Sequence, residues 1–210
     1  MIISHIHKFV YIAIPRTASK SMSEWLVQWF NGEWYGFHHQ WRVPEAYSDY
    51  LIFTMVRNPY ERELSAWFFQ SKMDDDPPPP RDPSEFVEVT SELYLQGDCT
   101  VLIEGHNVPE VRMNQAHWVK KAGISLVLHY ERLPECLIDL PFVKPEDIPS
   151  FPRVSERGQR PEHDFFAVFP APQAEVNVWK YAKDDFEMFG YERYRTDLRN
   201  PTQPRGAGDV

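Results

Sequence analysis

The first segment with residue types suited to chemistry, residues 14–21, joins an apolar run to a helical pattern. It is Ile-Pro-Arg-Thr-Ala-Ser-Lys-Ser, and its basic and hydroxyl side chains are Arg16, Thr17, Ser19, Lys20 and Ser21. The free N–H groups and the dipole at the start of a helix bind phosphate or sulfate. The segment therefore predicts an anion site. An ordinary helix start with Ser19 as its N-cap explains the same residues without a ligand.

The same segment matches only the end of the P-loop, the phosphate-binding motif G-x-x-x-x-G-K-[ST]. Lys20 and Ser21 fit that motif, but Ile14 and Ser19 occupy its two glycine positions. The second apolar run of the chain ends in Arg57 and not in an aspartate that would hold Mg²⁺. These differences favour an anion site that does not take an Mg–ATP complex, and we expect no bound metal.

The second polar segment, residues 56–65, follows that apolar run and leads into another helical pattern. It is Val-Arg-Asn-Pro-Tyr-Glu-Arg-Glu-Leu-Ser, with Arg57 at the expected strand end and Ser65 two turns into the expected helix. The forked guanidinium of Arg57 and the neutral hydroxyl of Ser65 could bind one phosphate together. The other interpretation is an ion pair between Arg57 and a nearby carboxylate.

Together the two segments resemble the sulfotransferases that use 3′-phosphoadenosine-5′-phosphosulfate (PAPS), in particular the carbohydrate-directed branch with heparan sulfate 2-O-sulfotransferase. That family has I-P-K-T-A-[GS]-[ST]-[ST] at the first segment and V-R-[ND]-P-x-x-R-x-x-S at the second, where every fixed position is met. Residues 129–133 resemble its Y-E-x-L element, and residues 184–191 resemble its D-x-x-x-F-G-Y element. The resemblance thus extends over about residues 8–194.

The resemblance implies binding roles for both segments. In the family the first loop holds the 5′-phosphosulfate and the second holds the 3′-phosphate, which gives the donor-site residues Arg16, Thr17, Ala18, Ser19, Lys20, Ser21, Arg57 and Ser65. Arg16 stands where the family has a lysine thought to stabilise the bridging oxygen as the sulfuryl group leaves, and Lys20 is the alternative. Arg157 and Arg160 correspond to family residues that close over the 3′-phosphate, although a solvated loop explains them equally well.

The resemblance also implies a catalytic base. Relatives of the 2-O-sulfotransferase type carry histidines between the first helix and the second strand, where this chain has His38 and His39. One of them would accept the proton of the acceptor hydroxyl during in-line displacement, and we favour His39 slightly. The predicted function is sulfuryl transfer from PAPS to a hydroxyl of a carbohydrate or related acceptor, a small molecule or a glycan. The alternatives are an Mg–ATP-dependent small-molecule kinase and a non-catalytic nucleotide-binding module.

The elements that must position these residues alternate between strands and helices. Apolar runs predict strands at residues 9–14, 51–56 and 124–130, and helical patterns occupy residues 19–30, 60–70, 110–121 and 175–189. This alternation predicts an α/β fold with a central parallel sheet flanked by helices. The resemblance implies its P-loop-NTPase-like three-layer form. Ligands of such sheets bind at the carboxyl ends of the strands, where both polar segments lie.

Length and composition exclude several classes of protein. The 210 residues, 42% of them hydrophobic, predict one folded domain at residues 1–195, with an acidic, proline-rich loop at 72–83 and a flexible tail at 196–210. A net charge of −9 argues against general binding of nucleic acid or of an anionic membrane. Two cysteines without metal-ligand spacing, and the lack of a signal-peptide or membrane-spanning pattern, predict a cytoplasmic protein.

Overall fold

The structure, a computed structural model, describes residues 1–70, 83, 101–103, 106–108, 114–152 and 165–194. The expected loop at 72–83, apart from Pro83, and the expected tail at 196–210 lie outside these residues. None of the described helices combines the length and the apolar character needed to cross a membrane.

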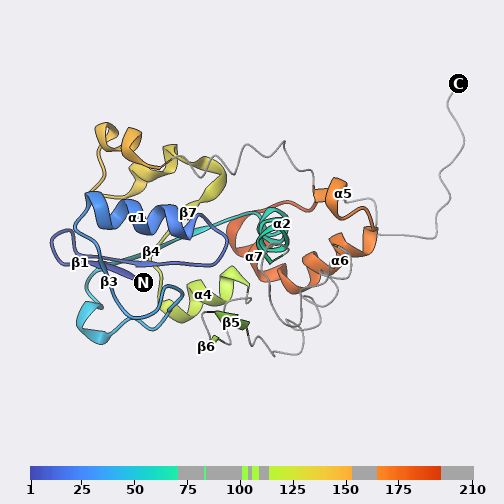
Figure 1. Ribbon diagram of the computed structural model, residues 1–210, viewed down its shortest axis with the longest axis horizontal. Helices are drawn as coiled ribbons and strands as arrows, with labels where there is room; N and C mark the ends of the chain where they lie inside the picture. Colours follow the sequence, from blue (N-terminus) through green and yellow to red (C-terminus); the bar gives the residue numbers. More distant parts are fainter. Residues whose placement is uncertain (71–82, 84–100, 104–105, 109–113, 153–164, 195–210) are drawn as a thin grey trace, which may run out of the picture.

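The centre of the molecule is a five-stranded sheet with the order β3-β1-β2-β4-β7 (Figure 1). Its strands are β1 (Ile2–Ser4), β2 (Phe9–Ile12), β3 (Glu33–Trp34), β4 (Leu51–Val56) and β7 (Leu126–His129). β4 pairs in parallel with both β2 and β7, whereas β1 pairs antiparallel with β2 and β3. The predicted parallel sheet is therefore confirmed at its centre. The short antiparallel strands β1 and β3 at one edge were not predicted.

Alternate residues of the central strands face opposite sides of the sheet, and helices cover both sides. On one side, Phe9 and Tyr11 pack against α1 (Ser19–Trp29) and against the segment that contains the 3₁₀ helices η3 (Glu135–Asp139) and η4 (Pro145–Ser150). On the other side, Val10 and Ile12 pack with Trp118 of α4 (Gln115–Ala122). Figure 1 shows α1 and α4 on opposite sides of the sheet, which confirms the predicted α/β fold.

A third apolar cluster lies at one end of the sheet (Figure 1). It joins α2 (Pro59–Gln70), α5 (Phe165–Val168), α6 (Pro172–Tyr181) and α7 (Lys183–Phe189). The prediction of one helix over 175–189 is wrong, because the helix is interrupted at Ala182, with φ −98° and ψ 15°. Contacts in the folded chain account for the break. The Tyr181 hydroxyl donates to a glutamate of α2 at 2.6 Å, whereas the Asp185 carboxylate accepts a backbone N–H of α4 at 2.7 Å.

The remaining described elements are short. β5 (Val101–Ile103) and β6 (His106–Val108) form an antiparallel pair, and two further 3₁₀ helices are η1 (Glu45–Tyr47) and η2 (Tyr130–Arg132). η2 follows β7 directly, and therefore lies near the end of the neighbouring strand β4.

Two glycines allow the cost of a left-handed backbone to be measured apart from the cost of a steric clash. The first is Gly123, at the end of α4. Gly123 has φ 64° and ψ 39°, and a Cβ atom added there would have no heavy atom within 4 Å. Gly123→Ala should therefore lower the free energy of unfolding by roughly 1 kcal/mol, because the left-handed conformation alone disfavours alanine. Urea denaturation measures this difference.

Gly32→Ala is the matched steric case. A Cβ atom at Gly32 would lie 2.6 Å from Ile2 Cγ2 and 2.9 Å from the carbonyl oxygen of Leu26. This substitution should cost more than Gly123→Ala, because core atoms must move to admit the methyl group. A Gly123→Ala protein as stable as the wild type would contradict the left-handed end of α4.

Candidate active site

The first loop, residues 13–18, follows β2 and has a backbone conformation suited to binding an anion. Arg16 and Ala18 have φ values of 69° and 58°, in the left-handed region. Left-handed residues alternating with ordinary ones direct successive N–H groups into one concavity that binds anions. Ala18 is the N-cap of α1, and no side chain of the described residues caps the helix. The interpretation of Ser19 as the N-cap is therefore wrong, and the first N–H groups of α1 are left for a ligand.

The side chains of this loop have different surroundings. The Thr17 hydroxyl is buried and donates to the carbonyl of Ile14 at 2.9 Å, which closes the loop. The Lys20 side chain is 85% exposed and lies 3.9 Å from a glutamate one turn further along α1. Ser19 and Ser21 are half-buried on the first turn of the helix. Thr17 can therefore offer its backbone but not its hydroxyl proton, and Lys20 points to solvent.

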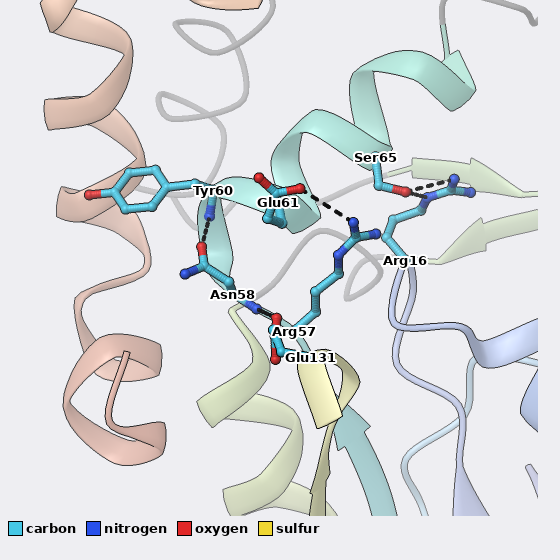
Figure 2. Close-up of polar contacts among 7 residues, drawn as sticks. All are labelled: Arg16, Arg57, Asn58, Tyr60, Glu61, Ser65 and Glu131. Atoms are coloured by element: carbon cyan, nitrogen blue, oxygen red, sulfur yellow. Dashed lines mark hydrogen bonds and ion pairs between the residues drawn. The ribbon is translucent and has the colours of Figure 1, made fainter. Parts of the chain in front are cut away.

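Two arginines connect the first loop to α2. Arg16 donates from Nε and Nη2 to Ser65 Oγ at 3.3 and 3.1 Å (Figure 2). Its guanidinium carbon also lies 4.3 Å from the centre of the Phe69 ring. Arg62, buried on the same helix, donates from Nε to the carbonyl of Pro15 at 3.1 Å. The structure thus brings the predicted residues of the two segments together.

Arg57 lies directly after β4, and its guanidinium points toward α2 (Figure 2). Its Nη2 lies 3.5 Å from Glu61 Oε2, and its guanidinium carbon lies 4.2 Å from the centre of the Tyr130 ring. The Nε is buried and has no hydrogen-bond partner in the described part of the chain. Arg57 therefore forms the ion pair of the alternative interpretation through one nitrogen, and keeps another donor for a ligand.

The backbone around Arg57 is held by side chains that had no predicted role. Gln115, the first residue of α4, accepts from the N–H of Arg57 and donates to its carbonyl, both at 2.8 Å. Glu131 of η2 accepts from the N–H of Asn58 at 2.6 Å, and Asn58 Oδ1 accepts from the N–H of Tyr60 at the start of α2 (Figure 2). Glu131 belongs to the Y-E-x-L element, but no signal in the sequence pairs Gln115 with a residue 58 positions away.

His38 and His39 lie side by side, with ring centroids 4.4 Å apart. His39 Nδ1 lies 2.6 Å from the carbonyl oxygen of Ala13 in the first loop. Because a carbonyl can only accept, Nδ1 carries the proton and Nε2 keeps its lone pair. His38 differs, since its Nε2 is buried without a partner among the described residues. Burial lowers the pKa of His39 to about 3 and that of His38 to about 4, so both rings are neutral at pH 7.

The predicted roles of Arg157 and Arg160 stay predictions, because both residues lie outside the described part of the chain. Among the residues that the structure does describe, no three His, Cys, Asp or Glu side chains are grouped so that they could hold a metal ion.

The two partly buried histidines predict a fold that loses stability in acid. Their pKa values in the folded protein, about 4 and about 3, lie below the ordinary value near 6.5. Below about pH 6.5 the unfolded chain therefore binds more protons than the folded one. The free energy of unfolding should fall as the pH falls toward these values, by up to about 1.4 kcal/mol per pH unit for each histidine.

Urea denaturation between about pH 4.5 and about pH 7 measures this slope. The double variant His38→Asn with His39→Asn should have a shallower slope, since asparagine does not titrate. An equal slope in the double variant would assign the acid sensitivity to other groups.

The part of the chain that holds these groups matches a known protein family. A family model described as the sulfotransferase family matches residues 1–139, which include both loops and both histidines. No curated protein matches the chain, and no solved structure does. The match covers well over half of the 210 residues. The chain therefore belongs to the sulfotransferase family.

Proposed function

We propose that this chain transfers the sulfuryl group of PAPS to a hydroxyl of a carbohydrate or related acceptor, with His39 as the base and Arg16 at the leaving group. Sulfuryl transfer as a reaction class follows from the family. One observation carries the rest: the loops after β2 and β4 meet through the contact of Arg16 with Ser65, and His39 is bonded to the first of these loops.

PAPS carries one anionic group on the 5′ side of its ribose and another on the 3′ side. The site offers two groups of hydrogen-bond donors. The N–H groups at the start of α1, with Arg16, suit the 5′-phosphosulfate. Arg57 and Ser65 suit the 3′-phosphate, because Arg57 Nε has no partner among the described residues. The Ser65 hydroxyl accepts from Arg16 and still has its own proton to donate. A ligand with both anionic groups would therefore engage both loops at once.

In the proposed reaction the acceptor oxygen attacks sulfur while the bond from sulfur to the bridging oxygen of the donor breaks. The proton of the acceptor passes to His39 Nε2, and the electron pair of the broken bond leaves on 3′-phosphoadenosine-5′-phosphate (PAP). Arg16 and the N–H groups of α1 stabilise that charge from fixed positions. We prefer Arg16 to Lys20 because Lys20 is 85% exposed. We prefer His39 to His38 because the hydrogen bond of His39 Nδ1 to the Ala13 carbonyl ties its ring to the first loop and leaves Nε2 to accept the proton.

A pKa of about 3 makes His39 a weak base in the free protein. The anionic donor would add negative charge near the ring, which favours the imidazolium form and raises the pKa. His39 therefore becomes an effective base only once the donor is bound.

Donor binding is the first test. In calorimetric titrations without Mg²⁺, PAP should bind more tightly than ADP or ATP. Arg57→Ala should weaken PAP binding about 10- to 100-fold, because hydrogen bonds to a charged group contribute about 1.5–3 kcal/mol. Arg42→Ala, which removes an exposed arginine that lies over Trp41, is the matched control and should leave PAP binding unchanged. Mg²⁺-dependent binding of ATP and no preference for PAP would contradict the proposal and favour a kinase.

Catalysis is the second test, with PAP release from PAPS measured against a panel of saccharides. His39→Asn should lower kcat by about 10²–10⁴-fold and leave PAP affinity unchanged, since asparagine can keep the hydrogen bond to Ala13 but cannot accept the proton. His38→Asn is the control and should have a much smaller effect. Equal losses in the two variants would contradict the assignment of His39, and PAP binding without turnover of any acceptor would favour a non-catalytic module.

A further inference from the structure

We propose that Asp185 and Tyr191, the first and last residues of the D-x-x-x-F-G-Y element, are positioning residues for Arg57. The proposal rests on the proposed function, because it connects this element to the 3′-phosphate side of the donor site. Each of the two residues binds one intermediate side chain, and that side chain binds a backbone N–H group. The two N–H groups belong to consecutive residues, Arg57 and Asn58.

Asp185 acts through Gln115, and both side chains are buried. Asp185 Oδ1 accepts the backbone N–H of Ala116 at 2.7 Å, and Oδ2 accepts from Gln115 Nε2 at 3.0 Å. The same amide accepts the N–H of Arg57 and donates to its carbonyl. The carboxylate therefore decides which way round the amide stands. If the oxygen and the nitrogen of the Gln115 amide exchanged places, the amide oxygen would face the Asp185 carboxylate. The N–H and the carbonyl of Arg57 would then both lose their partners.

Tyr191 acts through Glu131 on the next peptide unit. α7 ends at Gly190, whose φ of 71° lets the chain turn directly after the helix. The Tyr191 hydroxyl donates to Glu131 Oε2 at 3.1 Å, and Glu131 Oε1 accepts the N–H of Asn58 at 2.6 Å. Burial raises the pKa of Tyr191, so its hydroxyl remains a proton donor to the carboxylate.

These two connections matter because little else directs the Arg57 guanidinium. Its only ion pair among the described residues, with Glu61, is 3.5 Å long, and its other contact is with the face of the Tyr130 ring. The direction of the side chain therefore depends on where its backbone stands. Displacement of that backbone should weaken contacts with the 3′-phosphate and spare contacts with the rest of the nucleotide.

The test uses substitutions that preserve size. Asp185→Asn places an NH₂ group against either the N–H of Ala116 or the Nε2 of Gln115, whichever way it stands. Tyr191→Phe removes only the hydroxyl, and gives a second, independent test should Asp185→Asn fail to fold. Asp184→Asn is the matched control, because Asp184 is the neighbouring residue, is 52% exposed and pairs with Lys120 at the surface.

Calorimetry without Mg²⁺ measures the affinities for PAP and for AMP, which lacks the 3′-phosphate. Asp185→Asn should lower the ratio of PAP affinity to AMP affinity by at least about tenfold, with AMP affinity held within about threefold. Tyr191→Phe should lower the ratio by about threefold or more, and Asp184→Asn should leave it unchanged. In an Arg57→Ala background, Asp185→Asn should have no further effect on the ratio, because both changes remove the same contact.

The outcomes separate this proposal from the proposed function. Wild-type protein that binds PAP and AMP equally would overturn the proposed function, and this proposal with it. Wild-type protein that prefers PAP, with the preference unchanged in Asp185→Asn and Tyr191→Phe, would overturn the positioning role alone. An equal loss of affinity for PAP and for AMP in the two variants would also overturn the positioning role, since that result indicates general destabilisation.

Discussion

β2 and β4 pair in parallel with Ile12 opposite Thr54, and the Thr54 hydroxyl donates to the Ile12 carbonyl at 2.6 Å. Because parallel strands end at the same edge of a sheet, this register sets the loops that follow β2 and β4 next to each other. The contact of Arg16 with Ser65 depends on it. A shift by one residue would also turn the buried side chains of β2 to the opposite layer, so the core and the contact between the two loops require the same alignment.

The site concentrates positive charge in a chain whose net charge is −9. Arg16, Arg57 and Arg62 all lie where these two strands end, and each is engaged by protein groups without a ligand. Arg16 and Ala18 also hold the left-handed conformation that glycine would adopt without strain, at a cost of about 1–2 kcal/mol each. An anion bound to these groups meets donors already in place, which is how a fixed site stabilises charge that develops during a reaction.

Much of this arrangement could be predicted from the sequence, and the rest depends on contacts between distant residues. The strand at 51–56 and the helices that begin near Ser19 and Pro59 follow from local apolar patterns and are confirmed within a few residues. The interruption at Ala182 does not follow from local patterns, because α6 bonds to α2 whereas α7 bonds to α4. Likewise both loops could be identified as polar segments that follow strand ends. The left-handed φ values of the first loop could not, because the sequence has no glycine there.

The same limit applies to individual side chains of the site. The sequence favours His39 over His38 only slightly, because the hydrogen bond that distinguishes the two rings joins His39 to a carbonyl 26 positions away. Gln115 and Asp185 had no predicted role for the same reason, since their partners lie 58 or more positions away along the chain. Short motifs predict which groups would meet a ligand, whereas the groups that hold those motifs in place require the folded structure.

The most direct test of the central claim, that the two loops form one donor site, is a crystal structure of the protein with PAP bound. The 3′-phosphate should lie on Arg57 and Ser65, and the 5′-phosphate at the N–H groups of residues 16–21, close to His39. A nucleotide bound elsewhere, or bound here with its 3′-phosphate away from Arg57, would contradict the account.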